Sequence, residues 1–359
     1  MKEIILWHAA AHPSMRAQDA IKLCYQAAFG AEHLLADAEK ARAYFEREWD
    51  NVLPNDVPLW EPISKRYGRI NIAAWKHRNL PREWLFRMFY LTATSPSGAT
   101  CADLNENLAA VAEVAECNKL PFTAAEWKET LSVYERYGGG PIHHSEQYRN
   151  AEAPSYRVVD RRYIEIISLL LRIAEIHPQQ GPITIAIDGR AASGKTTLAQ
   201  KLSGILEAGV VHMDDFFLPP ALRTPERLAE AGGNVHYERF AEQVIPHLKD
   251  NGTFDYPVFN CSKMQLDGFR SVPAGQWRVV EGSYSHHPRL SEYMDLRVFC
   301  QISPDEQMRR ILVRNGQQMT QMFAERWIPM EEHYFKTYHI AEQADIIINT
   351  EEKEHETDI

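Results

Sequence analysis

Apolar residues in the first 150 positions recur at intervals of three and four, which is the period of an amphipathic α-helix. The spacing predicts helical segments at 21–29, 34–49, 84–91 and 104–115. Thr123-Ala-Ala-Glu126 is a capping box that predicts another helix start, and Gly138-Gly139-Gly140 predicts the end of that helix. Because no alternating strand pattern of comparable strength occurs here, we expect residues 1–155 to form an all-helical (all-α) domain.

The pattern changes after residue 182, where short runs rich in β-branched residues alternate with amphipathic segments. The runs predict strands at 183–187, 210–213, 277–280, 296–302 and 346–348. The segments between them predict helices at 195–206, 237–248 and 304–313. This alternation is typical of a parallel sheet sandwiched by helices. We therefore expect residues 156–359 to form an α/β domain that begins with a helix at 161–176.

Composition and charge exclude several classes of protein. Of the 359 residues, 45% are hydrophobic and 25% charged, as in globular proteins. The formal net charge of −10 argues against nucleic acid as a partner, because such binding needs a basic surface. The five cysteines form no C-x-x-C pair and fit a reducing cytoplasm. No run approaches the roughly 18 apolar residues of a membrane span. We expect a cytoplasmic protein, and a homo-oligomer remains one alternative.

One segment carries a specific signal for nucleotide binding. Gly189-Arg190-Ala191-Ala192-Ser193-Gly194-Lys195-Thr196 matches the Walker A pattern G-x-x-x-x-G-K-[ST], known as the P-loop, between a predicted strand and a predicted helix. The glycines let backbone N–H groups point at phosphate oxygens, which the start of the helix also attracts. Lys195 would lie beside the β- and γ-phosphates, and Thr196 would offer its hydroxyl to Mg²⁺. We expect ATP and Mg²⁺ as cofactors, with Gly189 through Thr197 binding the nucleotide.

Carboxylates follow two of the predicted strands. Asp214 and Asp215 come after the second strand, and Glu281 ends the third. Ligands bind at the carboxyl ends of parallel strands, so these side chains would face the P-loop. One carboxylate could hold Mg²⁺ and another could take the proton of an attacking hydroxyl, and either Asp214 or Asp215 could be that base. The alternative is a polar strand end without chemistry.

Two arginines lie four residues apart on one face of a later predicted helix. Arg310 and Arg314 could close over the phosphates and neutralise charge in the transition state. The alternative is a solvated helix face.

Taken together, residues 183–350 resemble the uridine kinase and phosphoribulokinase branch of the P-loop kinases. The resemblance also covers Pro257-Val-Phe-Asn260 and Ala344-Asp345 with the strand that follows. It implies that Asp214 is the base, that Glu281 belongs to the Mg²⁺ site with Thr196 and Asp214, and that Arg310 and Arg314 belong to a lid. The implied acceptor contacts are Asp215, Phe217, His236, Tyr237 and Tyr284. Asp215 and Phe217 stand where the family has serine and tyrosine, so the acceptor itself is not predicted.

We therefore expect an ATP-dependent kinase that transfers the γ-phosphate to a hydroxyl of a small molecule, such as a nucleoside or sugar. The alternative is a P-loop ATPase or switch that couples ATP binding to a partner of the helical domain. A base that faces an acceptor favours the kinase, because a switch needs none.

The helical domain resembles no family with a known function, but it carries polar residues that could form a site. They are His8, His12, Tyr25, Gln26, His33 and the run 141–149, which contains His143, His144 and Arg149. The two histidines and the arginine of that run could bind an anion or an acceptor. The alternative, which we favour, is that these are hydrogen-bonded core residues. Metal binding would need three or four converging ligands, and no H-E-x-x-H spacing exists.

Overall fold

The computed structural model describes residues 1–34, 37–176 and 181–351. Residues 35 and 36, in the second predicted helical segment, and 352–359, at the end of the predicted second domain, lie outside this description. The chain forms two compact units, Met1–Ala174 and Glu175–Asp358. The predicted boundary after residue 155 is wrong, because residues 156–160 form a strand that pairs within the first unit.

The first unit is mainly helical, as predicted. Its helices are α1 (Lys2–Ala11), α2 (Ala17–Phe29), α3 (Ala38–Asn51), α4 (Ile72–His77), α5 (Arg82–Ala93), α6 (Cys101–Glu116), α7 (Ala124–Arg136), α8 (Glu146–Glu152), α9 (Arg161–Ile164) and α10 (Ile167–Ala174), with the 3₁₀ turn η1 (Glu32–Leu34). The capping box forms at α7, where Thr123 accepts from the Glu126 N–H. The predicted helix at 161–176 is divided into α9 and α10.

A small sheet in this unit corrects the expectation of an all-helical domain. Strands β1 (Trp60–Pro62), β2 (Tyr67–Asn71) and β3 (Tyr156–Asp160) form an antiparallel sheet with β2 in the centre. Most of β2 and β3 is buried. A short strand buried on both faces has no alternating pattern, which explains why the sequence did not reveal it.

The second unit contains the predicted parallel sheet. Its strands are β4 (Ile183–Gly189), β5 (Gly209–His212), β8 (Trp277–Glu281), β9 (Leu296–Gln301) and β10 (Ile346–Asn349), in the order β10-β9-β4-β8-β5. All five predicted strands are confirmed. The central strand β4 places Ala186 opposite Val280 on one side and Arg297 on the other. Because β4 leads into the P-loop, the loop emerges in the middle of the sheet's carboxyl edge.

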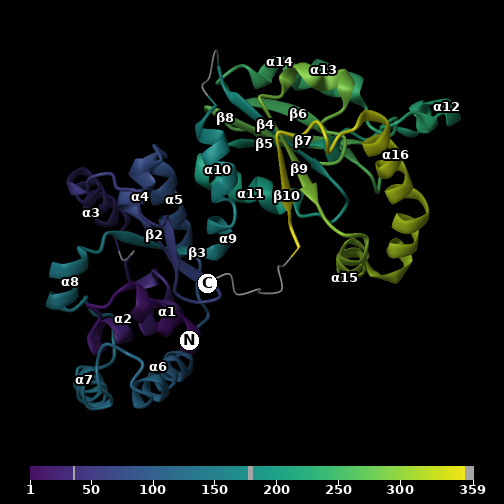
Figure 1. The fold of residues 1–359 in the computed structure, drawn as a ribbon. Coiled ribbons are helices and arrows are strands. Elements are labelled where there is room, and N and C mark those ends of the chain that lie inside the picture. Colours follow the sequence, from purple (N-terminus) through teal and green to yellow (C-terminus); the bar gives the residue numbers. More distant parts are fainter. Residues whose placement is uncertain (35–36, 177–180, 352–359) are drawn as a thin grey trace. The chain divides into compact units, whose positions relative to one another are not determined.

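Helices cover both faces of this sheet. They are α11 (Lys195–Leu206), α12 (Pro225–Ala229), α13 (Tyr237–Gln243), α14 (Ile245–Leu248), α15 (Pro304–Met322) and α16 (Ile328–Tyr338), with 3₁₀ turns η2 (Met213–Phe216), η3 (Pro220–Leu222) and η4 (Pro288–Tyr293) and the π-helical turn η5 (Phe323–Trp327). Figure 1 shows α11 on one side of the sheet and α13 and α14 on the other. On that second face, Val211, Val280 and Phe299 pack in a core with Phe240 and Tyr334.

A β-hairpin that the sequence did not predict stands beside the sheet. Strands β6 (Phe254–Asn260) and β7 (Gln265–Val272) pair antiparallel, with an irregularity between Pro257 and Phe259. Proline removes a ladder donor, and nearly all of β7 is exposed, so neither strand shows the pattern of a buried strand.

Candidate active site

The P-loop forms a tight turn between β4 and α11. Gly189 has a φ of 138°, and a side chain there would collide with the backbone carbonyl of Cys300. Lys195 donates hydrogen bonds to the Gly189 and Arg190 carbonyls at 2.7 and 2.9 Å. The Ser193 hydroxyl is buried and makes no hydrogen bond with the described residues. The loop therefore holds a cation and an unpaired hydroxyl where a phosphate group would fit.

Two buried carboxylates hold this loop in place. Asp188 accepts from the Gly189 N–H at 2.7 Å, the His286 N–H at 2.9 Å and the Tyr334 hydroxyl at 2.9 Å. Glu331, on α16, accepts from the Ala191 N–H at 2.9 Å and from Ser283 at 2.7 Å. Burial raises the pKa of Glu331, and Lys195 opposes that shift. Sequence reasoning missed Glu331, because 140 residues separate it from the loop.

Glu281 lies at the end of β8, directly beside the start of α11. Its Oε2 accepts from the Thr196 hydroxyl at 3.0 Å, and its Oε1 lies 2.5 Å from Nδ1 of His212. A hydroxyl and a carboxylate are oxygen ligands of the kind that Mg²⁺ takes in P-loop proteins. Thr196 and Glu281 therefore fit a Mg²⁺ ion chemically, and the structure brings the two together as the sequence predicted.

A cavity of about 670 Å³ opens in front of these residues. Among the described residues, six basic and three acidic side chains line it, in a chain whose formal net charge is −10. The basic ones are Lys195, Arg223, Arg309, Arg310, Arg314 and Arg326, and the acidic ones are Asp214, Glu281 and Glu331. An excess of positive charge inside an acidic protein favours an anionic ligand, such as the phosphates of a nucleotide.

Asp214 and Asp215 lie in different environments. The Asp214 side chain is exposed to the cavity, where the surrounding protein displaces water and raises its pKa, an effect that Lys195 opposes. Asp215 points away, is buried, and accepts from Arg270 Nε at 2.7 Å and from the Tyr256 hydroxyl at 2.9 Å. Asp214 therefore faces the ligand space, and Asp215 ties the hairpin to η2.

The two predicted lid arginines both line the cavity. Arg310 donates to the Thr350 carbonyl at 2.6 Å and to Glu306 at 2.7 Å. Arg314 donates to its neighbour Asn315 at 2.7 Å and lies over Phe323, 6.0 Å from the ring centre. Arg314 is therefore held by fewer hydrogen bonds than Arg310.

The predicted acceptor residues divide into two groups. Phe217 and Tyr284 line the cavity, and Tyr284 has a φ of 75°, which is uncommon for a bulky residue. His236 instead caps α13 beside Glu238, and Tyr237 stacks on His287 with ring centres 4.9 Å apart. Asp215, His236 and Tyr237 do not line the cavity and contact other residues instead. The structure therefore does not support them as acceptor contacts.

Further cavity residues escaped sequence reasoning. They are Arg223, Asn234, Cys261, Met264, Arg309, Arg326, Trp327 and Met330. They come from the segment after η2, the hairpin turn and the helices at the end of the unit. Only Arg309, next to Arg310, and the pair Arg326-Trp327 carried a local signal, as charged or aromatic residues close to the predicted lid.

The histidines and the arginine of the run 141–149 do not come together as the possible anion site would require. His143 and Arg149 are exposed, whereas His144 is buried and lies 2.8 Å from Asp19 and 2.6 Å from the Tyr156 hydroxyl. His8 and His12 come together with Glu61 in a separate cluster. The interpretation of His144 as a hydrogen-bonded core residue is therefore confirmed.

A P-loop on the central strand of a five-stranded parallel sheet covered by helices defines the second unit as a P-loop nucleotide-binding domain. The chain matches no model of a protein family. It is 29% identical over 146 residues to a uridine kinase of Chlamydia pneumoniae, over 37% of this chain and 64% of that protein. It is 26% identical over 122 residues to uridine-cytidine kinase C of Dictyostelium discoideum, over 33% of this chain and 27% of that protein. The chain thus spans less than two thirds of either relative.

Two solved structures are also similar. One is a possible uridine kinase from Bacillus stearothermophilus, with 22% identity and a TM-score of 0.41 over 52% of this chain and 99% of that one. The other is a putative fructose transport system kinase from Silicibacter, with 20% identity and a TM-score of 0.42 over 52% and 97%. The sequence similarity to the two curated uridine kinases thus covers about a third of this chain. Within the described residues, no helix combines the length and apolar character needed to cross a membrane.

Proposed function

We propose that the second unit transfers the γ-phosphate of ATP to a hydroxyl group of a small molecule. The observation that carries the proposal is that Asp214 opens into the same cavity as Lys195 and Thr196. Thr196 and Glu281 can hold Mg²⁺, so a nucleotide site alone does not need a second carboxylate exposed in front of the P-loop. An acceptor hydroxyl does need one, to orient it and to take its proton.

Each residue then has a defined part. The P-loop N–H groups and Lys195 bind the phosphates, as Ser193 would with its buried hydroxyl. Thr196, Glu281 and Asp214 would hold Mg²⁺, which supplies charge neutralisation between the phosphates. Asp214 accepts the proton of the acceptor, and Arg310 and Arg314 stabilise the charge of the transferring group. Phe217 and Tyr284 form part of the wall against which the acceptor lies.

The raised pKa of Asp214 suits a proton acceptor. The protein around Asp214 displaces water, which favours the neutral acid, and Lys195 limits this rise in pKa. A carboxylate whose pKa lies above its ordinary 3.8 is a stronger base than a solvated aspartate.

The test is ADP release by the purified chain with ATP and Mg²⁺, alone and with nucleosides, sugars and small alcohols. Nucleosides come first, because the curated relatives are named uridine and uridine-cytidine kinases. The Lys195→Ala variant should lose turnover, and Lys336→Ala, at an exposed position of α16, should keep it. Acceptor-dependent ADP release supports the kinase. ADP release that no acceptor stimulates, and that Lys195→Ala abolishes, would instead indicate the ATPase or switch.

A further inference from the structure

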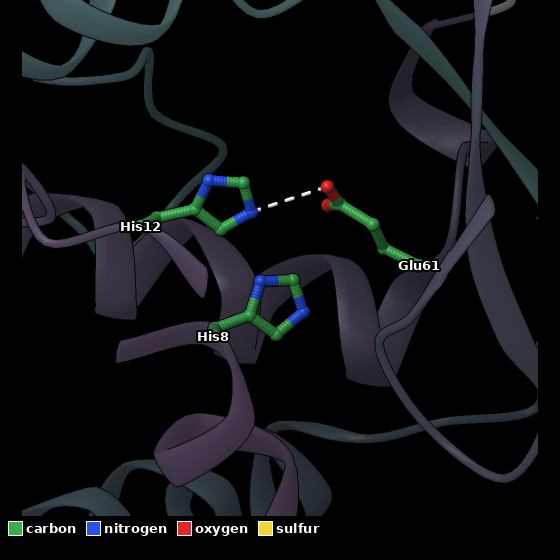
Figure 2. A group of neighbouring side chains, drawn as sticks. All are labelled: His8, His12 and Glu61. Atoms are coloured by element: carbon green, nitrogen blue, oxygen red, sulfur yellow. Dashed lines mark hydrogen bonds and ion pairs between the residues drawn. The ribbon is translucent and has the colours of Figure 1, made fainter. Parts of the chain in front are cut away.

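The first unit contains a cluster of metal-ligating side chains, far in sequence from the P-loop. His8 and His12 lie at the end of α1 and Glu61 lies on β1 (Figure 2). One ligand atom from each lies within 4.8 Å of the other two. We call this group the His8–His12–Glu61 cluster. Among the described residues, it is the one group of at least three His, Cys, Asp or Glu side chains whose ligand atoms all lie this close together.

The backbone determines this arrangement. His8 lies in the last turn of α1 and His12 is the residue that caps the helix, and their rings stack with centres 5.7 Å apart. Strand β1 then brings Glu61 to them, with Oε1 at 3.1 Å from Nε2 of His12. On a tetrahedral ion, two such ligand atoms stand about 3.3 Å apart. The His12–Glu61 pair therefore already has nearly the spacing that a tetrahedral ion needs.

Each histidine also has a second polar contact, which can orient its ring. His8 Nε2 lies 2.8 Å from the Pro62 carbonyl, and His12 Nδ1 lies 3.4 Å from Oε2 of Glu152. Metal-binding histidines commonly use one ring nitrogen for the ion and donate the other N–H to a carbonyl or carboxylate. Both imidazoles show this arrangement, which leaves one nitrogen of each for a ligand.

Charge and access are compatible with a cation. Glu61 and Glu152 contribute two negative charges, against the positive charge of Arg69, which lies close enough to influence both His8 and Glu61. His8 is fully buried, whereas the side chains of His12 and Glu61 keep 14% and 21% exposure. The cluster therefore has a rigid inner ligand and an outer side that solvent ions can reach.

We propose that His8, His12 and Glu61 bind a divalent transition-metal ion, for which Zn²⁺ is the probe. Two imidazoles and one carboxylate suit Zn²⁺, and a three-ligand set leaves a coordination position for water or another ligand. The competing explanation is a structural ion pair between His12 and Glu61, with no ion bound.

The experiment measures Zn²⁺ bound by the full chain after metal removal, by equilibrium dialysis and metal analysis. The wild type should bind about one ion per chain tightly. Glu61→Gln and His12→Ala should weaken that site at least about tenfold. His143→Ala, an exposed histidine of the same unit, should bind as the wild type does. A wild type without a tight site would overturn the proposal, as would equal binding by the wild type and both cluster variants.

Two measurements guard against misfolding of the variants. Glu61→Gln keeps the side-chain volume and an acceptor for His12, so its unfolding can be followed by tryptophan fluorescence with and without Zn²⁺. Zn²⁺ should raise the melting temperature of the wild type and not that of Glu61→Gln. X-ray absorption at the zinc edge of the wild type should detect two imidazole ligands, and a bound ion without imidazole would refute the site independently of any variant.

Discussion

The Thr196 hydroxyl donates a hydrogen bond to Oε2 of Glu281 across 3.0 Å. The bond joins the first turn of α11 to the end of β8, and its two oxygens are those that we propose as Mg²⁺ ligands. Nδ1 of His212 lies 2.5 Å from Oε1, the other oxygen of the same carboxylate. Glu281 is therefore oriented from both sides before any ion binds, so a metal does not need to order it.

Glu281→Gln tests this role. Glutamine still accepts from Thr196 but removes the negative charge that attracts the ion. We expect the Mg²⁺ concentration for half-maximal turnover to rise by at least about tenfold, with little loss of stability. Turnover titrated with Mg²⁺ at saturating ATP measures this, and Thr196→Ser, which keeps a hydroxyl, is the control. An unchanged Mg²⁺ requirement in Glu281→Gln would exclude Glu281 from the ion site.

Asp214 and Asp215 should respond differently to replacement by asparagine. Asp214→Asn should lower kcat by about 10²–10⁴-fold, because an amide cannot take the proton of the acceptor. Its melting temperature and its affinity for ATP in the absence of Mg²⁺ should change little, since Asp214 is exposed in the cavity. Single-turnover kinetics and nucleotide titration separate these effects. Normal kcat in Asp214→Asn would remove it as the base.

Asp215→Asn should affect the fold instead. The carboxylate accepts from Arg270 and Tyr256, so the amide loses a charge-assisted bond and misorients another. We expect a loss of about 2 kcal/mol in the free energy of unfolding, measured by urea denaturation. Arg270→Ala, which removes the partner, should destabilise the unit in the same direction. If Asp215→Asn is fully stable but inactive, Asp215 acts in catalysis after all.

The sequence could predict the parts of this unit that depend on local patterns. The P-loop needs only eight consecutive residues, and each parallel strand is a short, mainly apolar run. The choice between Asp214 and Asp215 could not be made in that way. It depends on Arg270, which lies 55 residues further along the chain. Arg270 belongs to the β6–β7 hairpin, which the sequence did not predict because Pro257 interrupts its strand pattern. Glu331 and Glu61 of the His8–His12–Glu61 cluster were missed for the same reason. Local sequence does not report contacts between distant segments.

Gly316 creates a kink inside the lid helix α15. Its φ of 76° and ψ of 170° belong to a region that is essentially restricted to glycine. No atom lies within 4 Å of the position that a β-carbon would take, so the obstacle to another residue is the backbone angle alone. The kink lies two residues after Arg314, in the helix that leads to η5, whose Phe323, Arg326 and Trp327 line the cavity.

Gly316→Ala should therefore disturb the lid. We expect a strain of about 1–3 kcal/mol, which the helix would relieve by straightening and moving Arg314 relative to the cavity. kcat should fall while ATP binding to the P-loop persists. Gln318→Ala, at an exposed position of the same helix, is the matched control. Full activity of Gly316→Ala at unchanged stability would show that the kink has no part in the lid.

His144 should make the first unit sensitive to acid. Burial lowers its pKa from 6.5 to about 4, although the hydrogen bond with Asp19 opposes the shift, and Arg69 and Lys22 lower the pKa further. The unfolded chain therefore takes up a proton at a higher pH than the folded one. The stability from neutral His144 is complete above about pH 6.5 and is lost as the pH falls toward 4. Asp19, whose pKa lies below its ordinary 3.8, contributes a loss only at lower pH.

His144→Gln removes this proton uptake. Between pH 7 and pH 5 the wild type should lose about 2 kcal/mol through His144, and the variant should lack that share of the loss. Urea denaturation followed by tryptophan fluorescence reports on the correct unit, because six of the eight tryptophans lie within residues 1–174. His8 and His33 also have lowered pKa values, so some acid sensitivity should remain in the variant. His143→Gln, at the exposed neighbour, should follow the wild type. If His144→Gln and the wild type lose equal stability over this interval, His144 is not a source of the acid sensitivity.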